Sequence, residues 1–303
     1  RTSSKASVDA FAESDEHHHH HPLLSKTGRN MSRLSSKSVA WPEYPEESQG
    51  SAIYATLKKA WSQFLPVSSA STLFPSSGIR KQDDAKKGCE LISRAISMDN
   101  LGGMGAVEAH LDFILKWIAY VLCSKEAPIG LQTLLGTISD LFSHLIEVGH
   151  ELSDSEAMTI APFIVEKASA ARGRFHDSLF DLVGMLRMPS LIPSKRFGSI
   201  VCISIIERSI HGRARLLAYQ YCLEIVEEAG LVGIGKKGVT VTAKNLTDEK
   251  SPGNKAAAMD LMIAILSRMN GGDIQRLVKI CGPNLTEKAR HEIEEKWVST
   301  SGG

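Results

Sequence analysis

The chain has 303 residues and a formal net charge of +1, with 23% charged and 6% aromatic residues. This near-balance argues against a dedicated nucleic-acid-binding protein, which usually carries a strong basic excess. No apolar run reaches the ~18 residues of a membrane-spanning helix, so we expect no membrane partner. The five cysteines form no CxxC pair, which is typical of reduced core thiols in a cytoplasmic protein. We therefore expect recognition through local patches of charge.

Residues 1–48 are rich in Ser and poor in apolar side chains, which predicts a disordered linker. The run His17–His21 lies within it. An expression tag, a natural histidine tract and a metal-binding segment are the alternatives, and we favour the natural tract because native-looking sequence flanks the run on both sides. Residues 49–299 carry helical periodicity and form the predicted domain, and 300–303 form a second short linker. We expect the chain to be a segment of a longer protein.

The first predicted helix begins near Gly50 and ends before a long Ser- and Pro-containing loop at 66–83. Its apolar residues recur at helical spacing and are Ile53, Leu57, Trp61 and Phe64. A second helix begins at the acidic pair Asp83-Asp84, because the N-terminus of a helix favours acids. Gly102-Gly103 then end this first helix pair.

Further helix pairs follow, each interrupted by a polar or basic break. The segment 107–122 is apolar on most of its circumference, which predicts one inner helix of a solenoid. A break at 124–130 separates it from its partner helix. Ser153 with Glu156 three residues later is a capping box that starts the third pair. The third to fifth pairs break at 169–173, at His211-Gly212 and at 249–253.

A glycine-rich stretch at 230–238 connects the fourth and fifth pairs, and we interpret it as a flexible loop. The following VTVTA at 239–243 is locally β-like, but we expect helical context to override five isolated residues. A closing unit covers 274–281 and 286–297. The breaks recur every roughly 40 to 47 residues, the range of HEAT and armadillo repeats. We therefore predict an all-α HEAT-repeat solenoid of about six helix pairs.

Motifs of catalysis and cofactor binding are missing from the sequence. It contains neither HExxH nor GxSxG. Glycines at 233, 235 and 238 match GxGxxG, but they follow a predicted helix, whereas a phosphate cradle follows a strand. Three histidines in helical stretches lack metal-ligand spacing, and they are His110, His144 and His150. We predict no enzyme, no catalytic residue, no cofactor and no metal.

Basic residues recur where the second helix of a pair begins, and they are Arg172, Arg174, Arg213, Arg215 and Lys255. A helix N-terminus carries partial positive charge, so each base there costs a few tenths of a kcal/mol, up to about 1. Repetition along the one edge where a solenoid aligns such corners indicates an acidic partner. The alternative is that these bases cap the last carbonyls of the preceding helix.

Four motifs carry a resemblance to a known family, and they are LDFILKWIAYVL (111–122), LSDSEAMTIAPFIVEKAS (152–169), SIHGRARLLAYQYCLEIVEEAG (209–230) and NGGDIQRLVKICGPNLTEKARHEIEEKW (270–297). From about Ala40 to Val298 the chain resembles a TOG domain of the microtubule polymerases related to Mini spindles and ch-TOG. It is most similar to the fourth TOG domain. The family's domains are paddles of six HEAT repeats that bind αβ-tubulin through their intra-repeat turns.

The resemblance implies a tubulin-binding edge made of Trp61, Lys125, Arg172, Arg174, Arg213, Arg215, Asn254 and Lys255. The implied partner is αβ-tubulin or the microtubule lattice, with other plus-end or centrosomal proteins beside it. The implied location is the cytoplasmic cytoskeleton, at microtubule plus ends, the spindle and the centrosome. Trp61 has a second interpretation, as a core residue of the first repeat.

The implied function is that of a non-enzymatic module of a microtubule polymerase, which promotes microtubule growth and spindle organisation. Charge reversal of Arg213 and Arg215 is expected to weaken tubulin binding without lowering the melting temperature. The alternative function is a HEAT-repeat scaffold that binds a centrosomal or kinetochore adaptor protein instead of tubulin.

Overall fold

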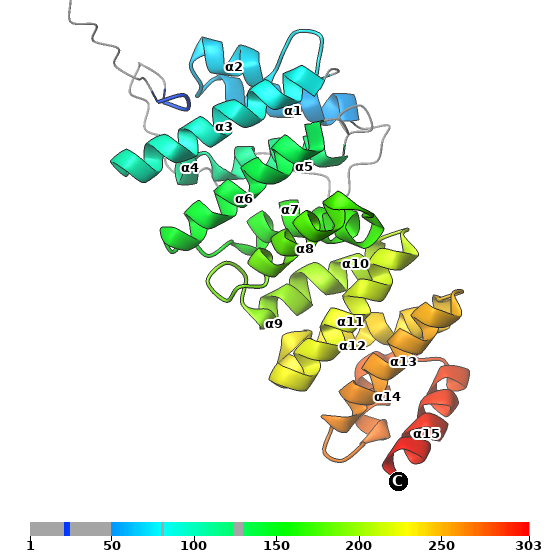
Figure 1. Ribbon diagram of the computed structural model, residues 1–303. Helices are drawn as coiled ribbons and strands as arrows, with labels where there is room; N and C mark the ends of the chain where they lie inside the picture. The colour runs from blue at the N-terminus through cyan, green and yellow to red at the C-terminus, as the bar shows by residue number, and fades with distance from the viewer. Residues whose placement is uncertain (1–20, 25–49, 80–81, 124–129, 303) are drawn as a thin grey trace, which may run out of the picture.

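The computed structural model describes residues 21–24, 50–79, 82–123 and 130–302. Within these ranges every regular element is helical, and the helices stack one after another along the molecule (Figure 1). The predicted all-α solenoid is confirmed, with one continuous apolar core running through the stack. None of the described helices combines the length and the apolar character needed to cross a membrane.

The first repeat contains α1 (Gly50–Ser62), α2 (Val67–Leu73) and α3 (Gln82–Gly102). The sequence predicted a loop at 66–83, and this prediction is wrong because α2 is a short helix there. Its last residue, Leu73, is fully buried, and the Leu73 carbonyl accepts a 3.0 Å hydrogen bond from Trp117 Nε1. Packing against a distant tryptophan therefore orders a segment whose local composition favours a loop.

The second repeat contains α4 (Ala106–Ala109), α5 (Leu111–Cys123) and α6 (Leu131–Glu147). The single helix predicted over 107–122 is divided at His110, which ends α4. His110 is buried, and its Nδ1 accepts a 2.9 Å hydrogen bond from Trp61 Nε1. The predicted break at 124–130 lies almost wholly outside the described residues.

The third repeat contains α7 (Asp154–Ala170) and α8 (Arg174–Leu186). The predicted capping box is confirmed, because Ser153 Oγ accepts from the Glu156 N–H at 3.3 Å and Glu156 Oε2 accepts from the Ser153 N–H at 2.9 Å. Two donors at the helix start are thereby satisfied reciprocally.

The fourth repeat begins with α9 (Ser194–Arg196), a π-helical turn (Phe197–Cys202) and α10 (Ile203–Arg208), followed by α11 (Gly212–Ala229). A 3-10 turn (Gly230–Gly233) leads directly into α12 (Gly235–Asp248). The predicted flexible loop at 230–238 is therefore wrong, whereas the expectation that VTVTA yields to its helical context is confirmed.

Close packing explains the glycines of this region better than flexibility does. A Cβ atom on Gly198 would lie 2.3 Å from the Gly233 carbonyl oxygen, and one on Gly233 would lie 2.4 Å from Ile225 Cγ2. Both positions exclude a side chain because neighbouring segments touch there. Within the GxGxxG match, Gly233 and Gly238 are therefore explained by close packing, whereas Gly235 adopts a left-handed φ of +67°.

The fifth repeat pairs α12 with α13 (Pro252–Ser267), and the stack closes with α14 (Ile274–Cys281), a 3-10 turn (Gly282–Asn284) and α15 (Glu287–Ser301). The closing unit begins and ends close to its predicted bounds, although α15 continues to Ser301 and takes in part of the predicted linker at 300–303. The predicted linker at 1–48 lies outside the described residues except for 21–24, which pack against the first repeat.

The connections of the stack lie along two opposite edges (Figure 1). The turns inside repeats, at 171–173, 209–211 and 249–251, follow the right-hand side of the view, and we call this side the intra-repeat edge. The connections between repeats, at 148–153, 187–193 and 268–273, follow the left-hand side, which we call the inter-repeat edge. The two edges offer separate surfaces.

Candidate functional site

The turn inside the third repeat presents two arginines to solvent. Gly173 has a φ of +62°, a left-handed conformation that glycine adopts without strain, and it separates Arg172 from Arg174. Both arginines are exposed, and in the described part of the chain neither forms an ion pair. The guanidinium of Arg174 lies 4.7 Å from the centre of the Phe175 ring, a cation–π contact that orients it.

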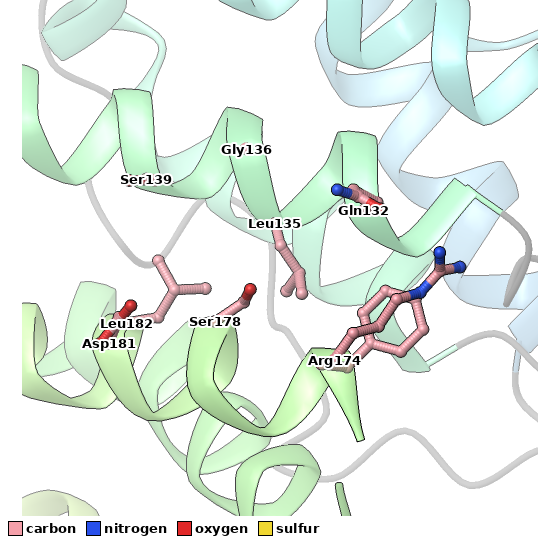
Figure 2. A pocket seen from close by; sticks show the side chains of 9 residues that line it. Gln132, Leu135, Gly136, Ser139, Arg174, Ser178, Asp181 and Leu182 are labelled. Carbon is pink, nitrogen blue, oxygen red and sulfur yellow. The ribbon is translucent and has the colours of Figure 1, made fainter. Parts of the chain in front are cut away.

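Arg174 also borders a hollow between α6 and α8, with a volume of about 280 Å³. Figure 2 shows Arg174 at one end of this hollow and Asp181 at the other, with Ser178 and Leu135 between them. Small residues such as Gly136 leave the space open. The hollow therefore lies directly next to the third turn.

The fourth turn places an apolar residue beside a basic one. Ile210 is 87% exposed, and Arg213 is exposed without an ion pair among the described residues. The His211 N–H donates to Ser209 Oγ at 3.2 Å, which stabilises the turn. The sequence analysis did not identify Ile210 as a surface residue. Its position in the short break between two predicted helices could have indicated that its side chain is exposed.

Arg215 connects the fourth turn to the fifth. Its Nε lies 2.7 Å from Glu249 Oε1 and its Nη2 lies 3.0 Å from Oε2, a two-pronged ion pair, and its Nη1 donates to the Ser209 carbonyl at 2.8 Å. Only 20% of the Arg215 side chain is exposed. Since Ser209 terminates α10, Arg215 fits the alternative interpretation, in which a base caps the preceding helix.

Glu249 is the centre of this connection, with 3% of its side chain exposed. Besides Arg215, it accepts hydrogen bonds from the Tyr219 hydroxyl at 3.0 Å and from Asn254 Nδ2 at 3.4 Å. Burial alone would raise the pKa of Glu249, but Arg215, Tyr219 and Asn254 outweigh it and lower the pKa. We call Arg215, Tyr219, Glu249 and Asn254 the cross-turn network.

Asn254 has a structural role in this network. Its side chain is buried, and its Nδ2 donates to the Gly212 carbonyl at 2.9 Å, which ties α13 to the start of α11. Lys255, the next residue, remains half-exposed, with its Nζ 3.1 Å from Glu292 Oε2 of α15. Lys125 lies outside the described residues.

Trp61 belongs to the core of the first repeat. Its side chain is 0% exposed, and its ring stacks on Phe113 with centres 5.7 Å apart. Burial lowers the pKa of His110 to about 4, so this ring is neutral and accepts the Trp61 Nε1 hydrogen bond. This position agrees with the core interpretation, and the side chain has no surface to offer a partner.

The intra-repeat edge therefore brings together a subset of the predicted residues. The solvent-facing side chains at the third to fifth turns include Arg172, Arg174, Ile210, Arg213 and the half-exposed Lys255, and we call these five residues the edge cluster. Arg215 and Asn254 support the cluster from behind through the cross-turn network. The arrangement places exposed positive charge at successive turns of one edge.

Comparison with known proteins finds the same architecture. No family model matches the chain, and no curated protein matches its sequence. A TOG domain structure from C. elegans Zyg9 matches with a TM-score of 0.61 and 16% identity, over 89% of this chain and 91% of that one. A structure from a study of TOG–tubulin binding specificity in microtubule dynamics and mitotic spindle formation matches with a TM-score of 0.57 and 18% identity, over 87% and 91%. The chain has the fold of a TOG domain.

Proposed function

We propose that this chain is a non-enzymatic tubulin-binding module whose edge cluster contacts the acidic surface of αβ-tubulin. The observation that carries the proposal is that Arg172, Arg174 and Arg213 lie at the third and fourth intra-repeat turns, exposed and without ion pairs among the described residues. Basic side chains without an internal ion pair remain available to pair with acidic side chains of a partner, which favours association. The TOG fold supports the same conclusion, because one similar structure comes from work on TOG–tubulin binding.

The edge cluster suits a large partner. Turns held by stacked helices keep a fixed spacing, so little conformational entropy is lost when they bind. The arginines supply charge steering, and Ile210 supplies an apolar contact that can be fully desolvated between them. Lys255 contributes a weaker contact, because Glu292 already neutralises part of its charge.

The test compares two triple charge reversals of the full chain. The first variant is Arg172→Glu, Arg174→Glu and Arg213→Glu, on the intra-repeat edge. The control is Lys195→Glu, Lys236→Glu and Arg276→Glu, which makes the same charge change at exposed bases near helix starts of the inter-repeat edge. We expect the first variant to bind tubulin about tenfold more weakly or worse in gel filtration and the control to bind normally. Equal binding by the two variants would refute the proposal.

We propose further that the module serves microtubule growth in the manner of a polymerase. Several such modules in one longer protein would raise the local concentration of tubulin at a growing end. This role predicts localisation to plus ends, the spindle and the centrosome in the cytoplasm. A fluorescent fusion of the parent protein carrying the three edge reversals should lose its plus-end signal, whereas the inter-repeat control should keep it.

A second candidate function has its own observation. The inter-repeat edge exposes an apolar residue at successive connections, and these residues are Leu101, Met104, Val148, Met188 and Val232. Exposed apolar residues repeated along one edge favour a protein partner. This edge suits the adaptor protein of a centrosome or kinetochore. A pull-down that enriches one such protein, and loses it after Val148→Ser and Met188→Ser, would support that function in place of tubulin binding.

A further inference from the structure

Three side chains with metal-ligating atoms meet beside the connection between α3 and α4, at residues 103–105. Asp99 comes from the end of α3, Glu108 from α4 and His144 from α6. One ligand atom of each residue lies within 4.8 Å of the others. The three residues belong to two repeats and are up to 45 positions apart, so their sequence spacing gave no sign of the cluster.

His144 directs its ring nitrogen Nε2 into the cluster. Its side chain is 2% exposed, and its Nδ1 lies 2.5 Å from Asn100 Oδ1, which places the ring hydrogen on Nδ1. The opposite nitrogen, Nε2, makes no hydrogen bond and lies 3.3 Å from Glu108 Oε1. A histidine that donates through one nitrogen to an oxygen, with the other nitrogen facing acids, has the arrangement of a metal-bound histidine.

The two carboxylates also keep oxygens without hydrogen bonds. Asp99 Oδ2 accepts a 2.7 Å hydrogen bond from the Val107 N–H, which leaves Oδ1 without one although the side chain is 1% exposed. Glu108 Oε2 is a buried oxygen in the same condition. Buried polar atoms without a hydrogen bond are rare in native proteins, and three such atoms in one place indicate a missing ligand.

The cluster is connected to the one described stretch of the N-terminal region. His21 Nε2 donates a 3.2 Å hydrogen bond to the Ala95 carbonyl. The same nitrogen lies 3.2 Å from Asp99 Oδ1, so His21 contacts one of the three clustered residues. Leu23 is fully buried, and the Pro22 carbonyl accepts a 2.6 Å hydrogen bond from Ser69 Oγ. Residues 21–24 are therefore docked on the first repeat next to the cluster.

We propose that Asp99, Glu108 and His144 bind a divalent transition-metal cation of the zinc type, which links the first two repeats. One imidazole nitrogen and two carboxylate oxygens, with water in a fourth position, match the ligand set and number that zinc accepts. Calcium and magnesium are hard cations that take oxygen ligands, so the imidazole nitrogen of this cluster favours a zinc-type cation over either. The cation neutralises two facing acids and holds α3, α4 and α6 together. The site is remote from the edge cluster, so its role is to stabilise the stack.

The test must separate this site from the histidine run, because a run of histidines binds zinc by itself. We therefore replace His17–His20 with serine and keep His21. Calorimetric titration of this EDTA-treated chain with zinc chloride should show one equivalent bound. At a hundredfold excess of zinc over its dissociation constant, the melting temperature should rise by about 5 °C or more. Magnesium chloride should produce neither effect.

Two ligand variants and one control, all made in that background, decide the assignment. His144→Gln and Glu108→Gln should each abolish the zinc-dependent rise, and Glu108 is exposed enough for its variant to fold should His144→Gln fail to do so. His176→Gln, a change at an exposed histidine paired with Asp177, should leave the rise intact. No binding of zinc in the background chain, or a full rise in Glu108→Gln, would overturn the proposal.

Discussion

The third and fourth turns carry similar sequences and use them differently. In both, a glycine introduces arginines at the start of a helix, with Arg174 after Gly173 and with Arg213 and Arg215 after Gly212. Arg174 and Arg213, next to their glycines, face solvent, whereas Arg215 lies two positions further along α11 and faces Glu249 of the next repeat. The position of a base relative to the helix start therefore decides whether it is free for a partner or supports the neighbouring turn.

The largest expected effect tests this distinction through stability. Replacing Arg215 by Met leaves the Glu249 carboxylate buried without its counter-ion, so we expect about 3 kcal/mol lower unfolding free energy. Arg213→Met, at the exposed position, should change it by less than about 0.5 kcal/mol. Urea titration of the two variants measures the difference. Similar losses of stability in both variants would contradict the distinction between a structural Arg215 and a solvent-exposed Arg213.

The cross-turn network also changes an expectation drawn from the sequence. Reversing Arg213 and Arg215 together was expected to spare the melting temperature. Since a glutamate at 215 would face Glu249, we now expect that double variant to unfold at a lower temperature. The binding test therefore uses Arg213 and not Arg215.

Acid conditions should show the next largest effect. The pKa of Glu249 is lowered in the folded chain, so its stabilisation is complete above about pH 4.5 and is lost as the pH falls through the lowered value. Glu249→Gln, expected to lose about 1–2 kcal/mol at pH 7, should differ less from the unsubstituted chain at pH 3. Chemical denaturation at both pH values measures the two gaps. A gap that is equal or larger at pH 3 would contradict the assigned ion pair.

The third turn should affect binding without affecting folding. The pair Arg172→Glu and Arg174→Glu should weaken tubulin binding about tenfold, equivalent to about 1.4 kcal/mol, because two exposed charges face the acidic partner with the wrong sign. Their melting temperature should stay unchanged, since neither arginine has an ion pair to lose in the described chain. Analytical gel filtration and thermal melting of the same sample separate the effect on binding from the effect on stability. A lowered melting temperature would show that Arg172 and Arg174 stabilise the fold, as Arg215 does.

The smallest expected effect is at Lys255. Its Nζ pairs with Glu292 at a half-exposed position, and such pairs contribute about 0–1 kcal/mol. Lys255→Ala should therefore alter stability by less than about 1 kcal/mol and tubulin affinity by less than about fivefold. A change as large as that of Arg215→Met would show that the fifth turn depends on this lysine as well.

Helical periodicity predicted most of the fold because each helix needs only its own residues to show an apolar face. The elements that failed depend on distant contacts. Trp117 orders α2 against its Ser-rich composition, and the contact between Gly198 and Gly233 turns an apparent loop into packed helices. No local pattern contains either contact.

The candidate site was less predictable for the same physical reason. The sequence predicted basic residues along one edge, but Glu249, the residue that makes Arg215 structural, is 34 positions away from it. Trp61 is buried by Phe113 and His110, which belong to the second repeat. Exposure is set by neighbours across repeats, so the sequence indicated which residue types matter and left open which of them remain free.

The docking of residues 21–24 moves the functional start of the domain. Leu23 fills a place in the apolar core at the first repeat, where a stack of repeats has no preceding neighbour to cover it. A shortened chain beginning at residue 40, which sequence composition would recommend, removes this cover along with the linker. A shortened chain for binding assays should therefore keep His21 to Leu24. Without them the end of the core is uncovered, and a loss of stability could be misread as a low affinity.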